Sequence, residues 1–171
     1  MIHPIRAMKA KLIPVGILVV GAAMVGMPAF AATSTAKTTF TVTATVNATC
    51  TIAATNLSFG TYTGTAATGQ STVSVTCTNT TPYNVGLDQG TSTSATVTTR
   101  AMTGPSGATL NYALYQDSAH ATNWGNTPGT DTVSGTGNGA TQALTVYGRI
   151  ASGQYPAPGA YTDTVTATVY Y

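Results

Sequence analysis

A long alternation near the start of the chain constrains the fold most. Across residues 40–52 the even-numbered positions are apolar or small, beginning with Phe40 and Val42, and nearly every odd-numbered position is Thr or Asn. Period two over this length is the pattern of a β-strand with one buried face. Because ordinary strands have about five or six residues, the stretch predicts a segment that either serves two pairing partners or bends midway.

Six further segments predict short strands. Each is rich in β-branched and aromatic residues, and Gly, Pro, Asn and Thr clusters separate them. They cover residues 57–62, 72–78, 83–87, 110–115, 143–150 and 162–171. Many short strands with regular turns predict an all-β, two-sheet sandwich in a single domain. The Gly-rich stretch 123–139 predicts a long surface loop.

The first 31 residues predict a cleavable export signal. Arg6, Lys9 and Lys11 precede an apolar run over residues 12–25, which is shorter than the roughly 20 residues of a membrane span. Small residues at Ala29 and Ala31 then predict cleavage after Ala31, so the mature protein begins at Ala32. An uncleaved N-terminal anchor is the alternative.

Charge in the exported part argues against two classes of partner. Its three basic and four acidic residues are Lys37, Arg100, Arg149, Asp88, Asp117, Asp131 and Asp163. Nucleic acids and anionic membranes are bound by clustered Lys and Arg, and these charges are scattered. We expect neither partner.

Cys50 and Cys77 are the two cysteines of the chain, and both lie in the exported part. The bacterial periplasm is oxidising, so a disulfide between them is the natural expectation. A metal site is the alternative, but two thiols need further ligands and the exported part adds only His120.

Catalytic chemistry is poorly supported by the residues. His120 is the one histidine after the export signal, no G-x-S-x-G elbow frames a serine, and Asp117 and Asp131 lie in turn-like sequence. We therefore expect no enzyme and no cofactor. A hydrolase using His120 and a sugar-binding platform built on Trp124 and nearby tyrosines remain alternatives.

The last predicted strand alternates again. Val165, Ala167, Val169 and Tyr171 share one face, and Asp163 falls in the same phase, so its carboxylate must be exposed or hydrogen-bonded. The chain ends with this strand, which predicts an edge left without a partner.

Seven stretches in order resemble one family, the spore coat protein U domain, which includes the major subunits of archaic, Csu-type chaperone-usher pili. They are ATCTI at 48–52, LSFGTY at 57–62, VTCT at 75–78, LNYALY at 110–115, WG at 124–125, TVYGRI at 145–150 and GAYTDTV at 159–165. Each is weak alone, while their order and spacing are specific.

The resemblance implies an incomplete immunoglobulin-like β-sandwich that lacks its last strand and is completed by donor-strand complementation. A periplasmic chaperone fills the resulting groove first. At the outer-membrane usher, the N-terminal segment of an identical or related pilin subunit then replaces the chaperone strand. This pathway delivers the subunit through the periplasm to a pilus on the cell surface, where it serves attachment and biofilm formation.

The residues of this chain take definite places in that scheme. Residues 32–43 are the expected donor extension, with Phe40 and Val42 entering the groove, and residues 44–171 the domain, with its first strand at 44–52. The expected acceptor edge and chaperone contact are Val165, Ala167, Val169 and Tyr171. Tip adhesins of such systems resemble two-domain proteins, so a stalk subunit is favoured. A secreted carbohydrate-binding module or a spore or surface coat protein is the alternative.

Overall fold

The computed structural model describes residues 33–171, so the predicted export signal at residues 1–31 lies outside the described part. The chain divides into two units, Met1–Val42 and Thr43–Tyr171. Residues 33–49 form neither helix nor strand, and all of them are exposed. Phe40 and Val42 are 86% and 81% exposed. The alternating stretch is thus largely unpaired within its own chain.

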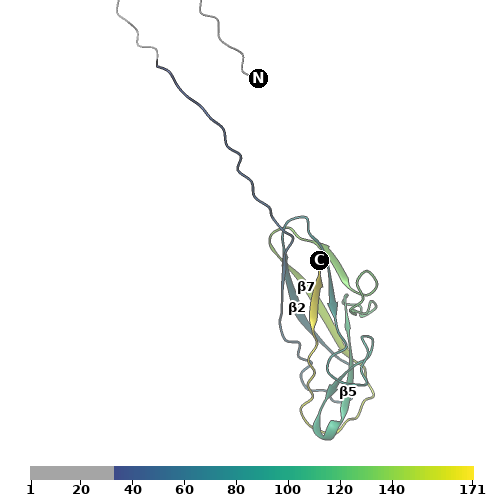
Figure 1. Ribbon diagram of the computed structural model, residues 1–171. Coiled ribbons are helices and arrows are strands. Elements are labelled where there is room, and N and C mark those ends of the chain that lie inside the picture. The colour runs from purple at the N-terminus through teal and green to yellow at the C-terminus, as the bar shows by residue number, and fades with distance from the viewer. Residues whose placement is uncertain (1–32) are drawn as a thin grey trace, which may run out of the picture. The chain divides into compact units, whose positions relative to one another are not determined.

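The regular secondary structure of the unit Thr43–Tyr171 is almost all antiparallel β-strand (Figure 1). Its strands are β1 (Cys50–Ala54), β2 (Ala67–Cys77), β3 (Pro82–Leu87), β4 (Arg100–Thr103), β5 (Thr109–Tyr115), β6 (Val133–Thr136), β7 (Thr141–Ile150) and β8 (Ala167–Tyr170), with one 3₁₀ turn at Pro105–Gly107. Within residues 33–171, no helix is long and apolar enough to cross a membrane.

Two sheets make the sandwich. The larger has the strand order β1-β2-β7-β5-β4, and the smaller has the order β6-β3-β8. The long strands β2 and β7 lie side by side along the domain (Figure 1), with a register from Ala67↔Ile150 to Thr76↔Thr141. The strand β8 pairs with β3 alone, so it lies at the edge of the smaller sheet.

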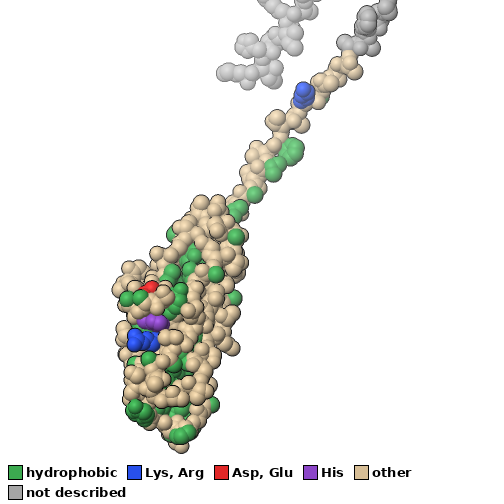
Figure 2. Space-filling model, turned by 180° about the vertical axis from the view of Figure 1, so that it is seen from behind, with side chains coloured by type: hydrophobic (Ala, Val, Ile, Leu, Met, Phe, Trp, Pro, Cys, Tyr) green, Lys and Arg blue, Asp and Glu red, His purple; other side chains and the backbone are tan. Residues whose placement is uncertain are grey.

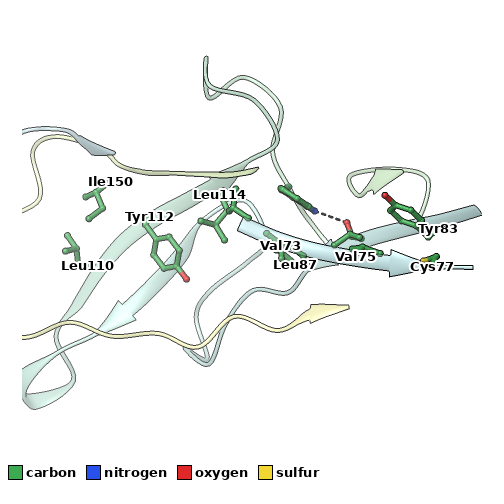
Figure 3. Packing of buried hydrophobic residues seen from close by; sticks show 12 residues of the cluster. Val73, Val75, Cys77, Tyr83, Leu87, Leu110, Tyr112, Leu114 and Ile150 are labelled. Carbon is green, nitrogen blue, oxygen red and sulfur yellow. Dashed lines mark hydrogen bonds between the residues drawn. The ribbon is translucent and has the colours of Figure 1, made fainter. Parts of the chain in front are cut away.

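The core lies between the sheets and draws on both. Its most buried apolar side chains are Val73, Val75, Cys77, Tyr83, Val85, Leu87, Leu110, Tyr112, Leu114, Trp124, Val146 and Ile150. Figure 3 shows Leu110, Tyr112 and Ile150 at one end of this cluster, and Tyr83 and Cys77 at the other. Alternate residues of β2 and β5 point into it, because side chains along a strand alternate between its two faces.

The predicted disulfide between Cys50 and Cys77 is confirmed. The two residues are the terminal register pair of β1 and β2, with their Cα atoms 4.1 Å apart. Because each thiol is consumed by the other, neither is available to bind a metal.

Strand predictions at 72–78, 83–87, 110–115 and 143–150 are confirmed as β2, β3, β5 and β7 with shifted ends. The first strand, predicted at 44–52, begins only at Cys50. Alternation describes which face of a strand is apolar, whereas a ladder also needs a partner, and in this chain β2 provides one only from Cys50 onward.

Three other predictions need correction. Residues 57–62 form no strand, and the strand predicted at 162–171 is limited to Ala167–Tyr170. The expected surface loop at 123–139 contains β6 and the buried Trp124. The strand β4 was not predicted, since its sequence, RAMT, does not alternate and places an arginine in the interior.

Replacing both Cys50 and Cys77 by Ala is expected to lower the free energy of unfolding by about 3 to 4 kcal/mol, because the bond closes a loop between residues 27 apart. Urea unfolding followed by circular dichroism measures the change. As a control, the native protein with reductant should shift to the same midpoint, and a midpoint that stays unchanged in both experiments would contradict the prediction.

Candidate functional site

A groove of about 1030 Å³ with an apolar floor opens beside the core. One wall runs from Ala54, the last residue of β1, to Gly64, and the other comprises residues 154–159, 161–165 and Ala167 of β8. The floor is made by buried core side chains, namely Val73, Leu87, Leu110, Tyr112, Leu114, Val146 and Ile150. Leu57, Phe59 and Val165 line the groove only partly buried, so an apolar occupant would remove more of their surface from water.

The first wall is held by a pair of glycines. Gly69 of β2 and Gly148 of β7 are register partners, and Leu57 and Phe59 pack over them. A Cβ on Gly148 would lie 2.8 Å from Leu57 Cδ1 and 2.9 Å from Phe59 Cζ. Residues 57–59 therefore press on the inner face of the larger sheet, which explains why they form no ladder of their own.

A hydrogen-bonded link joins the two walls at one end. The Tyr62 hydroxyl donates to the Ala151 carbonyl at 2.7 Å and accepts from the Gln154 amide at 3.2 Å. The Gly153 amide also donates to the Gly64 carbonyl at 2.9 Å. These bonds fix the separation of the walls.

The strand β8 has one satisfied and one unsatisfied edge. The Asp88 amide donates to the Thr166 carbonyl at 3.1 Å, and Thr168 and Tyr170 are register partners of Gly86 and Asn84. In an antiparallel ladder the bonds to one neighbour involve alternate residues. Even-numbered residues of this strand therefore bond to β3, and the N–H and C=O groups of Val165, Ala167 and Val169 point to the free edge.

Two carboxylates anchor the approach to β8, where the β3 ladder no longer reaches. Asp163 accepts hydrogen bonds from the Thr91 amide, the Thr91 hydroxyl and the Tyr112 hydroxyl, at 2.8, 2.8 and 2.7 Å. Asp88 accepts from the Thr166 amide at 2.9 Å. The sequence requirement that Asp163 be exposed or hydrogen-bonded is thus met by hydrogen bonding. Among the lining residues in the described part of the chain, Asp163 alone is charged.

The same contacts shift two pKa values. Burial alone would raise the pKa of Asp163, but hydrogen bonds from Thr91 and Tyr112 favour the carboxylate, and its pKa is lowered. Burial, followed by the hydrogen bond to Asp163, raises the pKa of Tyr112. Tyr112 therefore keeps its proton and remains the donor.

Arg100 is completely buried and was not identified from sequence. Its guanidinium donates to the carbonyls of Asp88, Val97, Leu87 and Trp124 at 2.7 to 2.9 Å. Burial lowers its pKa. Four carbonyl acceptors replace the water that the charge loses, and they tie the end of β3 to the β3–β4 loop. No motif signals this role, since one arginine in a Thr-rich run is consistent with a solvent-exposed position.

The structure places the expected site residues in three different environments. Val165, Ala167 and Val169 pack against the core along the free edge, whereas Tyr171 is 63% exposed. Phe40 and Val42 are exposed in the extension. Their roles as acceptor and donor remain predictions. Sequence reasoning missed the walls at 57–59 and 154–159, because neither has a recognisable period.

The alternative functions receive little support from the side chains on which they depend. Trp124 is 1% exposed, and its indole N–H donates to the Val85 carbonyl at 2.8 Å, so it cannot form the expected sugar-binding platform. His120 lies edge-on to the rings of Tyr115 and Tyr147. The Asp117 carboxylate accepts the amides of Ala121 and Thr122, which is a turn-forming role.

Charged side chains are sparse on one face of the described residues. Figure 2 shows a face on which a few Lys, Arg, Asp and His side chains lie among many uncharged ones. No clustered basic patch is visible among the described residues on that face.

An all-β sandwich with an unpaired edge strand beside an apolar groove is the class that this fold and site define. Residues 36–168 match the family model of the Spore Coat Protein U domain, and the chain belongs to this family.

Two known proteins are similar to the chain. Protein U of Myxococcus xanthus is 34% identical over 128 residues, covering 67% of this chain and 71% of Protein U. A chain in the crystal structure of the CsuC–CsuE chaperone–tip adhesion subunit pre-assembly complex, from archaic chaperone-usher Csu pili of Acinetobacter baumannii, is 26% identical with a TM-score of 0.55. That match covers 74% of this chain and 41% of the other, so this protein spans less than half of its structural relative. The sandwich is immunoglobulin-like.

Replacing Asp163 by Asn is expected to destabilise the domain at neutral pH and progressively less in acid. A carboxyl whose pKa is lowered on folding contributes stability above its unfolded pKa, and that contribution is lost as the pH falls through the folded pKa, below 3.8. Urea unfolding of both proteins from pH 7 to pH 3 measures the gap between their unfolding free energies. A gap that stays constant would contradict the role given to Asp163.

Replacing Gly148 by Ala is expected to lower the unfolding free energy by about 1 to 3 kcal/mol, because the added Cβ displaces Leu57 and Phe59. Thr145→Ala, on an exposed position of the same strand, serves as the control and should change it by less than about 0.5 kcal/mol. Urea unfolding measures both, and equal effects would contradict this packing argument.

Proposed function

We infer that this protein is a structural subunit of a surface pilus assembled by the chaperone-usher pathway through donor-strand exchange. One observation carries the inference: β8 leaves the edge of its sheet unpaired beside a groove of about 1030 Å³ with an apolar floor, while residues 33–49 of the same chain form no strand and alternate from Phe40 onward. A chain that offers both a strand and a place for a strand is suited to head-to-tail polymerisation.

Two comparisons support the inference. The chain belongs to the spore coat protein U domain family. Its structural relative comes from a chaperone–subunit complex of chaperone-usher pili. A chaperone that supplies a temporary strand would keep the groove covered before assembly, because exposed strand edges and apolar clefts aggregate.

In the proposed assembly a periplasmic chaperone first pairs with the free edge at Val165, Ala167 and Val169, with Tyr171 near the end of the contact. At the outer-membrane usher, the extension of an identical or related subunit replaces the chaperone strand. This is strand addition to an open sheet edge, in which main-chain hydrogen bonds provide affinity and alternate side chains fill the groove. Phe40 and Val42 are the residues assigned to filling it.

The expected energy suits a durable fibre. Burying each large side chain contributes about 1.5 to 3 kcal/mol, and each ladder bond about 0.5 to 1.5 kcal/mol. A strand with several of each would contribute roughly 10 kcal/mol per junction. Slow dissociation then keeps the polymer intact without covalent links.

The proposed position is a stalk subunit exported through the periplasm, with residues 1–31 removed. One sandwich domain fills residues 43–171, which leaves no second domain for receptor binding within the part of the chain that the structure describes. Attachment and biofilm formation would then be properties of the whole fibre rather than of a receptor pocket in this chain.

Replacing Val42 by Asp is expected to abolish heat-resistant multimers, because a carboxylate cannot be buried unpaired in an apolar groove. The measurement is electrophoresis of unheated and heated full-length protein produced with its chaperone and usher. Thr41→Asp is the control. It places the same charge on the face of the strand that points away from the groove, so its multimers should persist.

Circular dichroism of the Val42→Asp protein separates assembly from folding, and its β-signal should match that of the native protein. Unchanged multimers in the Val42→Asp protein, or equal loss in both variants, would contradict donor-strand assembly in this phase.

A further inference from the structure

The face of β8 and its approach that points away from the core is a row of threonines. Thr162, Thr164 and Thr166 are exposed, and Thr168 is half-buried. They occupy even positions, so they alternate with the inward-facing Val165, Ala167 and Val169. The row follows the free edge of the smaller sheet.

The N-terminal extension carries a matching row. Its odd positions are Thr33, Thr35, Lys37, Thr39, Thr41, Thr43, Thr45, Asn47 and Thr49, all of them exposed. When Phe40 and Val42 enter the groove, the polar residues at odd positions must face outward. Lys37 supports this phase, because a lysine that pointed into an apolar groove would lose its hydration without gaining a partner.

The alternation of hydrogen-bonded and non-hydrogen-bonded pairs along an antiparallel ladder places the two threonine rows opposite each other. The free N–H and C=O groups of the edge belong to odd residues, so an incoming antiparallel strand forms its hydrogen-bonded pairs at Val165, Ala167 and Val169. Inward-facing even residues of the extension occupy those pairs. The outward threonines of both strands then fall at the non-hydrogen-bonded pairs, where opposite Cα atoms are only about 4.5 Å apart and side chains are closest.

The domain already uses such threonine contacts. Thr51, Thr76 and Thr141 lie in one row across β1, β2 and β7. The hydroxyls of Thr76 and Thr141 are 2.9 Å apart and hydrogen-bonded. Each cross-strand threonine pair of this kind stabilises a sheet by about 0.2 to 1 kcal/mol relative to a pair of alanines at the same positions.

Resting on the function inferred above, we propose that outward threonines of the extension and of β8 pair across each junction between two copies of this chain, forming a threonine ladder on the outer face. The ladder is a second recognition surface in addition to the apolar groove. It favours a strand with threonine at most outward positions, and this chain's own extension has threonine at every odd position from Thr33 to Thr49 except Lys37 and Asn47. Contact between two rows of β-branched side chains also slows dissociation of the donor strand from the groove, because all the contacts along the rows must be broken together.

The test compares dissociation rates of multimers formed by the full-length chain. One variant removes the donor row (Thr39→Ala with Thr41→Ala), one removes the acceptor row (Thr164→Ala with Thr166→Ala), and one combines them. Thr68→Ala with Thr145→Ala, on the exposed outer face of β2 and β7, is the matched control. Dissociation in guanidinium is followed by electrophoresis without heating.

Donor and acceptor variants should each dissociate about three- to tenfold faster than the native multimer, with the control unchanged. The combined variant should dissociate no more than about twice as fast as either one, because both remove the same contact. Effects that multiply in the combined variant, or none at all, overturn the ladder. If the Thr164→Ala with Thr166→Ala variant does not fold, Thr164→Ser with Thr166→Ser takes its place as the acceptor variant. Its effect on the dissociation rate should show the same coupling to the donor variant.

Failure of the ladder and failure of the proposed function give different results. If Phe40→Asp abolishes multimers while the threonine variants remain uncoupled, donor-strand assembly stands and the ladder is wrong. If Phe40→Asp leaves multimers intact, the assembly mechanism itself is wrong.

Discussion

The unsatisfied edge of β8 is the constraint on which the rest of the molecule depends. Main-chain N–H and C=O groups are costly to leave unpaired, and an open edge beside apolar side chains invites another strand. In this domain β3 satisfies one side of β8, while Val165, Ala167 and Val169 direct their groups to the other side. The groove lies beside these unpaired groups, and the extension and the proposed partners are the segments proposed to pair with them.

An open edge is useful only if it stays in place without its partner. Asp163 and Asp88 hold the approach to β8 through side-chain hydrogen bonds, and Arg100 connects the end of β3 to neighbouring loops. Gly69 and Gly148 let Leu57 and Phe59 lie flat as the opposite wall. Preorganisation of this kind reduces the entropy that an incoming strand must lose on binding. The need to hold the end of β3 in place also explains why a chain with very few charges buries Arg100.

Much of the fold was predictable because its signals are local. Segments rich in β-branched and aromatic residues predicted β2, β3, β5 and β7, and the export context predicted the disulfide. The errors share one cause, since β1, β8 and the segment 57–62 were assigned from local side-chain pattern, while a strand also needs a neighbour at hydrogen-bonding distance. The packing of Val165, Ala167 and Val169 against the core follows from their alternation, while their role as an acceptor edge stays a prediction. Arg100 and the walls were not anticipated, because long-range packing positions them.

The sequence by itself determined the all-β class, the disulfide partners and the two apolar phases, because each depends on residue type and period. Only the tertiary structure decided that residues 33–49 form no strand, that Trp124 is buried, and that the free edge predicted for the last strand lies beside a groove. These features depend on which segments meet in space. A periodic pattern records which face of a strand is apolar, and it carries no information about whether a neighbouring strand is present.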